Sequence, residues 1–248
     1  MNNRNKVALV IGSGKKRIGN CIARALAEHG FDIALHYRSS RVDAEETAAE
    51  LKRFNIASEL FCADVSCEAE VNTLFSQVLE RFSRLDLLVV AHGSWPAIKF
   101  ENIKAEDVVS QFEINLLGTF LCCHRAGMLM TTQQEGGLIV TIGDWAVKRP
   151  YRDYAPYLIS KGAIPTLTRT FAVELAAINP AVRVNCVLPG PVMVPEDLSE
   201  LEKQEALEGT LLKRFGMPDH VAQAVIFFVD NDYTTGVCLP IDGGRTIA

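Results

Sequence analysis

The sequence predicts a single-domain, doubly wound α/β fold, in which a parallel seven-stranded sheet carries helices on both faces. Short apolar runs alternate with longer amphipathic stretches along all 248 residues. Most apolar runs are nearly continuous in Val, Ile and Leu, which is typical of strands buried on both faces. No linker, repeat or low-complexity tract interrupts the chain, so we expect one domain over residues 1–248.

Seven apolar runs are expected to form the strands. In order they are KVALVIG (6–12), FDIALHY (31–37), ASELFCADV (57–65), LDLLVVAHG (85–93), GLIVTIG (137–143), VRVNCVLPG (182–190) and VCLPIDGG (237–244). Helical periodicity between them predicts helices near 18–29, 43–54, 68–82, 105–130, 154–178 and 218–229. Because Pro165 removes a backbone donor, it should kink the helix over 154–178 or end it early.

Residues 191–216 break this alternation between the sixth and seventh strands. The segment is rich in Glu and Leu, and Leu198, Leu201 and Leu207 could form one apolar stripe of a helix. Ligands of such sheets bind beyond the carboxyl ends of the strands, and long insertions tend to be functional. We therefore predict a substrate lid at 191–216, the alternative being a surface helix pair without a role.

The bulk composition excludes several classes of protein. A net charge of −5 and a pI near 5.6 argue against nucleic-acid binding. The seven cysteines form no C-x-x-C motif, which favours reduced, buried thiols over a metal site. The first apolar run is too short for a signal peptide, and no run is long enough to span a membrane. We expect a soluble cytoplasmic protein without metal, nucleic-acid or membrane partners.

The stretch VIGSGKKRIGN (10–20) follows the first strand and opens the first helix. Glycines let the backbone approach a pyrophosphate, and the helix N-terminus supplies free N–H groups and the positive end of the helix dipole. This context predicts a Rossmann-type dinucleotide site, with ordinary turn chemistry as the alternative. The residues expected to contact the cofactor here are Gly12, Ser13, Gly14, Arg17, Ile18 and Gly19.

The end of the second strand favours NADP(H) over NAD(H). Tyr37, Arg38 and Ser39 stand there without an acidic residue. A guanidinium beside hydroxyl groups binds a phosphate well, whereas a carboxylate would favour a free ribose 2′-OH. A solvated arginine is the alternative. Asp64, with Val65 beside it, closes the third strand and could accept a hydrogen bond from the adenine amine.

Tyr157 and Lys161 form a Y-x-x-x-K pair that shares one helix face, and Asp144 stands thirteen positions before the tyrosine. A free tyrosine, with a pKa near 10, exchanges protons slowly at neutral pH. A nearby ammonium group favours the phenolate and so makes the tyrosine a better acid–base group. The pair therefore predicts proton transfer at this site.

The chain resembles the short-chain dehydrogenases/reductases over nearly its whole length. The resemblance rests on the Gly-rich turn, ADV (63–65), FEINLLGTF (112–120), YLISK (157–161), VRVNCVLPG (182–190) and IDGG (241–244). It implies that Tyr157 donates the proton, that Lys161 holds the nicotinamide ribose and lowers the tyrosine pKa, and that Asn115 steadies a water-linked proton path. It also implies that Pro189 and Gly190 contribute to the cofactor site.

The same resemblance implies a homo-oligomer, a dimer or tetramer, that pairs the helices expected at 105–130 and 154–178. The chain also departs from the family pattern. Ser13 takes the place of the first glycine in a gapless alignment, the alternative being a loop that is one residue longer. Val90-Ala91 replace the usual asparagine pair. His92 follows them, where we expect a hydrogen-bonded loop histidine rather than a catalytic group.

Asp144 is a further departure, because the family usually has a serine at this place. A serine donates a hydrogen bond to a forming alkoxide, whereas an ionised carboxylate would repel it. The carboxylate therefore favours reduction at C=N. Trp95 could stack a flat heterocycle, and Arg17 could reach a cofactor phosphate or a substrate carbonyl.

KRIG (16–19), GSW (93–95) and GDWAVKR (143–149) together resemble the pteridine reductases, of the dihydromonapterin or dihydrofolate reductase type. We accordingly expect NADPH-dependent reduction of a dihydropterin or dihydrofolate, with Arg17, Trp95, Asp144 and Tyr157 contacting the substrate. Two alternatives stay open: a carbonyl reductase, for example of 3-oxoacyl groups or other ketones, and a non-catalytic NADP(H)-binding regulator.

Overall fold

The computed structural model describes residues 5–193 and 199–248 and confirms the predicted seven-stranded parallel sheet. Its strands are β1 (Val7–Ile11), β2 (Asp32–Tyr37), β3 (Ser58–Cys62), β4 (Leu87–Val90), β5 (Gly137–Ile142), β6 (Val182–Pro189) and β7 (Cys238–Ile241). They lie in the order β3-β2-β1-β4-β5-β6-β7, and every neighbouring pair is parallel. The strand order reverses at the neighbouring strands β1 and β4, so a crevice is expected at the carboxyl ends of these two strands.

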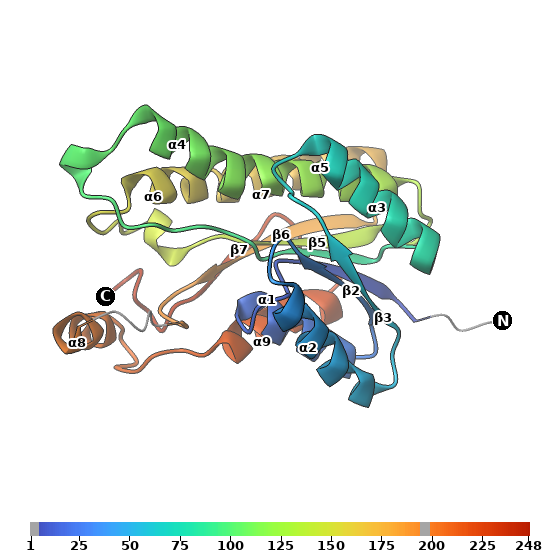
Figure 1. Ribbon diagram of the computed structural model, residues 1–248, viewed down its shortest axis with the longest axis horizontal. Coiled ribbons are helices and arrows are strands. Elements are labelled where there is room, and N and C mark those ends of the chain that lie inside the picture. The colour runs from blue at the N-terminus through green and yellow to red at the C-terminus, as the bar shows by residue number, and fades with distance from the viewer. Residues whose placement is uncertain (1–4, 194–198) are drawn as a thin grey trace.

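Helices cover both faces of the sheet (Figure 1). They are α1 (Ile18–Glu28), α2 (Arg41–Leu51), α3 (Glu68–Phe82), α4 (Ala105–Gln111), α5 (Gly118–Thr131), α6 (Ala155–Gly162), α7 (Ile164–Ile178), α8 (Glu200–Glu208) and α9 (Pro218–Asp230). Within the described residues, no helix combines the length and the apolar character needed to cross a membrane.

Two apolar cores lie on opposite faces of the sheet because successive side chains of a strand alternate. Along β1, Leu9 and Ile11 pack into the core under α3, α5 and α7. Ala8 and Val10 pack into the core under α1 and α9. Figure 1 shows these two helical layers above and below the sheet, with α8 apart from both layers, near the C-terminus.

Each of the two long helices expected from the sequence is divided in the structure. The helix over 105–130 contains a π-helical turn, Phe112–Leu117, between α4 and α5. The helix over 154–178 is divided at Ala163 into α6 and α7. Pro165 stands in the first turn of α7, where its missing N–H costs little, so the expected interruption is confirmed.

The predicted lid segment forms one helix, α8, in the part that the structure describes. Ser199 caps α8, and the Glu202 side chain completes a capping box. Leu198 lies outside the described residues, and Leu201 is 69% exposed, so Leu201 does not anchor the helix by packing. Instead, the Arg245 guanidinium donates a hydrogen bond to the Ala206 carbonyl of α8. The lid function of this segment stays a prediction.

Candidate active site

A cleft of about 310 Å³ opens at the carboxyl ends of β1, β2, β3 and β4. It lies at the switch in strand order, where ligands of doubly wound sheets bind. Predicted cofactor and substrate residues from distant parts of the chain meet in its lining. They are Gly12, Gly14, Arg17, Ile18, Tyr37, Arg38, Ser39, Asp64, Val65 and Trp95.

The turn between β1 and α1 is built around its glycines. Gly12 has φ +80°, and a Cβ there would lie 2.9 Å from the His92 backbone. At Gly19 a Cβ would collide with the Gly12 carbonyl, so α1 starts tightly against the turn. No side chain caps the start of α1, which leaves its first N–H groups available to an anion. This backbone cradle fits a dinucleotide pyrophosphate.

Six other predicted cofactor residues lie outside the lining of this cleft. Two of them, Tyr157 and Lys161, are described below, and the other four are Ser13, Gly19, Pro189 and Gly190. The Ser13 hydroxyl is fully buried, donates to the Val10 carbonyl at 2.8 Å and accepts from the His36 N–H at 3.1 Å. Its side chain therefore joins β1 to β2 instead of facing the cleft. Gly19 serves the turn through its lack of a Cβ. Pro189 and Gly190 adjoin β7, where the Gly190 N–H donates to the Ile241 carbonyl.

The end of β2 forms one side of the cleft, with Tyr37, Arg38 and Ser39 in sequence. The Arg38 side chain is 58% exposed, and its Nη1 lies 3.6 Å from Oδ2 of Asp64. Hydrogen bonds from Ser66 hold the pKa of Asp64 below its usual value despite some burial. The arrangement presents a guanidinium beside a hydroxyl group, with a carboxylate opposite them.

The tyrosine and aspartate singled out in the sequence meet directly. Tyr157 Oη donates to Asp144 Oδ2 at 2.6 Å, and Asp144 Oδ1 accepts from the Ala146 N–H at 2.8 Å. Asp144 follows β5, and Tyr157 lies in the first turn of α6. Lys161 Nζ, one turn further along α6, donates to the Ile142 carbonyl at 2.9 Å. The end of β5 and one face of α6 thus bring the three groups together.

Burial governs the proton affinities of this cluster. It raises the pKa of Tyr157 well above 10, and the negative charge of Asp144 raises it further. Burial also raises the pKa of Asp144 and lowers that of Lys161. The family resemblance implied a tyrosine pKa lowered by Lys161. In this arrangement the pKa of Tyr157 is raised instead, first by burial and then by the charge and hydrogen bond of Asp144, while the Lys161 ammonium bonds to a backbone carbonyl.

Asn115 connects α6 to the loop after β4. Its Oδ1 accepts from the Ser94 N–H at 3.0 Å, and its Nδ2 lies 3.0 Å from Ser160 Oγ on α6. Nδ2 is also within hydrogen-bond distance of the Ser94 carbonyl and of Gln111 Oε1. Ser160, Ser94 and Gln111 were missed in the sequence. Only Ser160, inside the Y-x-x-x-K motif, carried a signal that could have identified it.

Trp95 and Arg17 contact each other at the mouth of the cleft. The Arg17 Cζ lies 4.7 Å from the centre of the Trp95 ring, a cation–π arrangement. The indole is 40% exposed and lines the cleft, so it can offer an apolar face to a flat ligand. Arg17 thereby holds the orientation of the side chain expected to stack the substrate.

A series of aromatic rings leads away from Tyr157, and sequence reasoning did not identify it. Tyr157 contacts Tyr154, Tyr154 contacts Tyr151, and Tyr151 stacks on Trp145. The Arg245 guanidinium lies 4.6 Å from the centre of the Trp145 ring. Since Arg245 also bonds to α8, the residues after β7 link α8 to the aromatic series beside Tyr157.

Comparison with known proteins gives matches over nearly the whole chain. A family model described as enoyl-(acyl carrier protein) reductase matches residues 12–246. The human 3-oxoacyl-[acyl-carrier-protein] reductase is 35% identical over 240 residues, which are 96% of this chain and 97% of that protein. Carbonyl reductase family member 4 of Xenopus laevis is 33% identical, with the same two coverages.

Solved structures agree with the sequence relatives. The acetoin dehydrogenase of Enterobacter cloacae has a TM-score of 0.89 and 32% identity, and the match covers 100% of this chain and 98% of that one. An NAD⁺-bound xylitol dehydrogenase has a TM-score of 0.90 and 28% identity, over 98% of this chain and 100% of that one. These proteins are similar in fold and sequence to the chain described here.

The buried carboxyl of Asp144 leads to a pH-dependent prediction. Its folded-state pKa is raised, so its contribution to stability is fully present below about pH 4 and is lost as pH rises through the folded pKa. Asp144→Asn cannot ionise and should have a larger free energy of unfolding than wild type near neutral pH. The difference should shrink toward about pH 4. Urea unfolding at a series of pH values measures it.

The exposed carboxylate of Asp232 offers a matched control. Asp232→Asn should leave the pH profile of stability close to that of wild type. A gain from Asp144→Asn that stays constant from acid to neutral pH would contradict a buried, titrating carboxyl at position 144.

Proposed function

The chain belongs to the short-chain dehydrogenase/reductase family, and we propose that it is an NADP(H)-dependent oxidoreductase that reduces the carbonyl group of a small molecule to an alcohol. The Tyr157–Asp144 hydrogen bond beside Lys161 is the observation that carries this proposal. The relatives support it, since their names describe 3-oxoacyl and carbonyl reductases and acetoin and xylitol dehydrogenases. They favour this reading over the dihydropterin reductase expected from the sequence.

In this mechanism the bound nicotinamide cofactor supplies the hydride. Tyr157 donates the proton to the developing alkoxide oxygen, and its raised pKa keeps it protonated at neutral pH. The Lys161 ammonium, whose positive charge acts on Asp144, would offset the negative charge left on the Tyr157–Asp144 pair after the transfer. Asn115, bonded to Ser94 and Ser160, holds the loop after β4 against α6, where both of these groups lie.

The burial of Asp144 gives its carboxyl group a role in carbonyl reduction, because it makes the protonated form easier to reach. An ionised carboxylate would repel a forming alkoxide. Because burial raises the pKa of Asp144, the protonated form is more accessible than in water. A protonated carboxyl donates a hydrogen bond, as the usual serine does. Asp144 would then donate this bond to the substrate oxygen, while its Oδ1 accepts from the backbone N–H of Ala146.

Reduction of a dihydropterin or dihydrofolate at C=N is the second candidate. It is favoured by one specific combination, an aspartate bonded to Tyr157 and an indole exposed in the cleft under Arg17. An ionised Asp144 could accept from the N–H groups of such a ring, and Trp95 could stack on it. The third alternative, a non-catalytic NADP(H)-binding regulator, would not need an acid–base pair.

Turnover assays separate these candidates. With NADPH, the purified protein should reduce ketones or 3-oxoacyl thioesters faster than dihydrobiopterin or dihydrofolate. Tyr157→Phe removes the proton donor and should lower kcat by about 10²–10⁴-fold. Asp144→Ser should keep carbonyl turnover. Turnover of pterins alone would establish the second candidate, and cofactor binding without any turnover would favour the regulator.

The NADP(H) preference rests on the residues at the end of β2. Arg38 supplies a guanidinium in the cleft, with Ser39 and Ser40 beside it. The carboxylate nearest to this guanidinium is Asp64, on the neighbouring strand end at 3.6 Å. A 2′-phosphate would therefore meet a positive group and hydroxyl donors.

Arg38→Asp tests this preference. It replaces a charge-assisted hydrogen bond with repulsion, so KM for NADPH should rise about 10–100-fold while KM for NADH changes far less. Arg41→Asp is the matched control, because Arg41 pairs with Glu45 on the same surface and is 75% exposed. Equal losses for the two cofactors in Arg38→Asp would remove Arg38 from the 2′-phosphate site.

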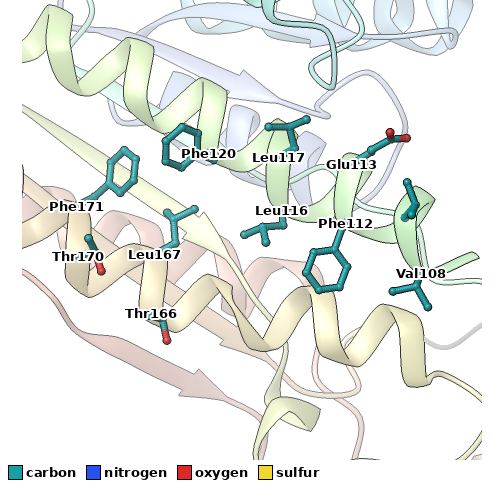
Figure 2. Close-up of a pocket in the computed structure, with 11 residues that line it drawn as sticks. Val108, Phe112, Glu113, Leu116, Leu117, Phe120, Thr166, Leu167, Thr170 and Phe171 are labelled. Atoms are coloured by element: carbon teal, nitrogen blue, oxygen red, sulfur yellow. The ribbon is translucent and has the colours of Figure 1, made fainter. Parts of the chain in front are cut away.

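We also propose that the chain forms a homo-oligomer. A groove of about 680 Å³ runs between the α4–α5 segment and α7. In Figure 2, Phe120 and Leu117 lie on one wall, and Leu167 and Phe171 on the other. Apart from Glu113 and two threonines, the described lining is apolar. A second copy that pairs these helices would cover this apolar surface.

Charge placed in the groove should separate the copies. Val109 lines the groove and is 55% exposed, so Val109→Asp should not disturb the core. We expect this variant to show a smaller mass than wild type in light scattering after gel filtration. Leu201→Asp, on exposed α8 outside the groove, should keep the wild-type mass. A monomeric wild-type protein would refute this interface.

A further inference from the structure

His92 lies between the cofactor cleft and the π-helical turn, and neither the fold nor the proposed chemistry accounts for it. It follows β4 and lines the cleft. Its Nε2 lies 2.8 Å from the Ile114 carbonyl oxygen. Its Nδ1 is buried and has no hydrogen-bond partner among the residues that the structure describes. The ring therefore makes one polar contact, directed at the helix backbone next to Asn115.

The chemistry of this contact fixes the state of the imidazole. A carbonyl oxygen only accepts, so Nε2 must carry the hydrogen. Burial, with a smaller contribution from the charge of Lys161, lowers the pKa of His92 to about 3. The ring is thus neutral and presents a single N–H donor to Ile114.

The helix is shaped to receive this ring. A Cβ on Gly118 would lie 3.0 Å from His92 Nε2, so a side chain there would press against the imidazole that reaches the Ile114 carbonyl. A π-helical turn moves backbone hydrogen bonds from the usual i+4 donor to i+5, and a side chain that inserts into this ladder stabilises such a distortion. His92 and Gly118 therefore form a matched pair at the turn Phe112–Leu117.

The π-helical turn determines the orientation of Asn115, the residue after Ile114. Its side chain lies within hydrogen-bond distance of Ser94 and of Ser160. Its position depends on the phase of the π-helical turn, because a regular α-helix would rotate the side chain away from these partners. A hydrogen bond from His92 to the Ile114 carbonyl therefore stabilises the π-helical backbone and, with it, the orientation of the Asn115 side chain.

We propose that His92 is a positioning residue whose Nε2–H bond to the Ile114 carbonyl holds the π-helical turn and so aims Asn115 at Ser94 and at the catalytic helix. The inference rests on the proposed function, because it assigns Asn115 a part in turnover. A histidine that only filled space beside the cleft would need the volume of the ring and no donor.

Two substitutions of similar size separate these roles. His92→Gln keeps an N–H donor at the distance of Nε2, and His92→Met keeps the length without a donor. His92→Met should lower kcat about tenfold, the equivalent of one hydrogen bond, with KM for NADPH unchanged. His92→Gln should recover most of this loss. Equal kcat losses in the two variants, or a change confined to KM for NADPH, would overturn the proposal.

A double-mutant cycle tests the route through Asn115. In an Asn115→Ala background, His92→Met should lower kcat no further, because the residue that it positions is gone. An additional tenfold loss would show that His92 acts by another route and would refute the proposal.

A measurement without turnover keeps the inference separate from the proposed function. Nitrogen-15 NMR of the imidazole should report a neutral ring protonated at Nε2 in the wild-type chain. Amide hydrogen exchange at 114–119 should quicken in His92→Met and stay near wild type in His92→Gln. A ring protonated at Nδ1, or unchanged exchange in His92→Met, would refute the positioning role. An inactive wild-type chain with the expected exchange would overturn the proposed function alone.

Discussion

The parallel register of β1, β4 and β5 is the constraint on which the rest of the site depends. Ile11 pairs with Val90, and Val90 pairs with Thr141, so the three strands end at the same edge of the sheet. The Gly-rich turn, the loop that carries His92 and Trp95, and the segment that carries Asp144 therefore start side by side. A slip of one residue would turn each of these segments to the opposite face.

Burial of charge is the second physical theme of the site. Asp144, Tyr157 and Lys161 are all removed from water, and their pKa values move in the direction that disfavours the charged forms. The opposite charges of Asp144 and Lys161 partly offset this cost. The result is a phenol proton held between Tyr157 and Asp144 by a hydrogen bond, as the proposed proton transfer requires.

Both irregularities of the long helices lie beside this cluster. The π-helical turn carries Asn115, and the division at Ala163 separates the helix of Tyr157 and Lys161 from α7. Irregular turns within helices are frequent at functional positions, because they change the direction of a side chain without loss of the surrounding packing. Here the first turn directs an amide toward Ser94 and Ser160, and the second ends the helix that carries Tyr157 and Lys161.

The sequence alone determined what depends on local pattern. Apolar runs identified all seven strands, the glycine turn indicated the dinucleotide site, and the spacing of Tyr157 and Lys161 put both on one helix face. Contacts between distant segments were decided only by the tertiary structure. They include the burial of Ser13 against His36, the His92–Ile114 bond and the Arg245–Trp145 contact. From the sequence alone, Asp144 is expected to be an ionised carboxylate, and this expectation favours reduction at C=N. Its proton affinity instead depends on burial, and burial is set by every element that packs around a residue rather than by its neighbours in the chain.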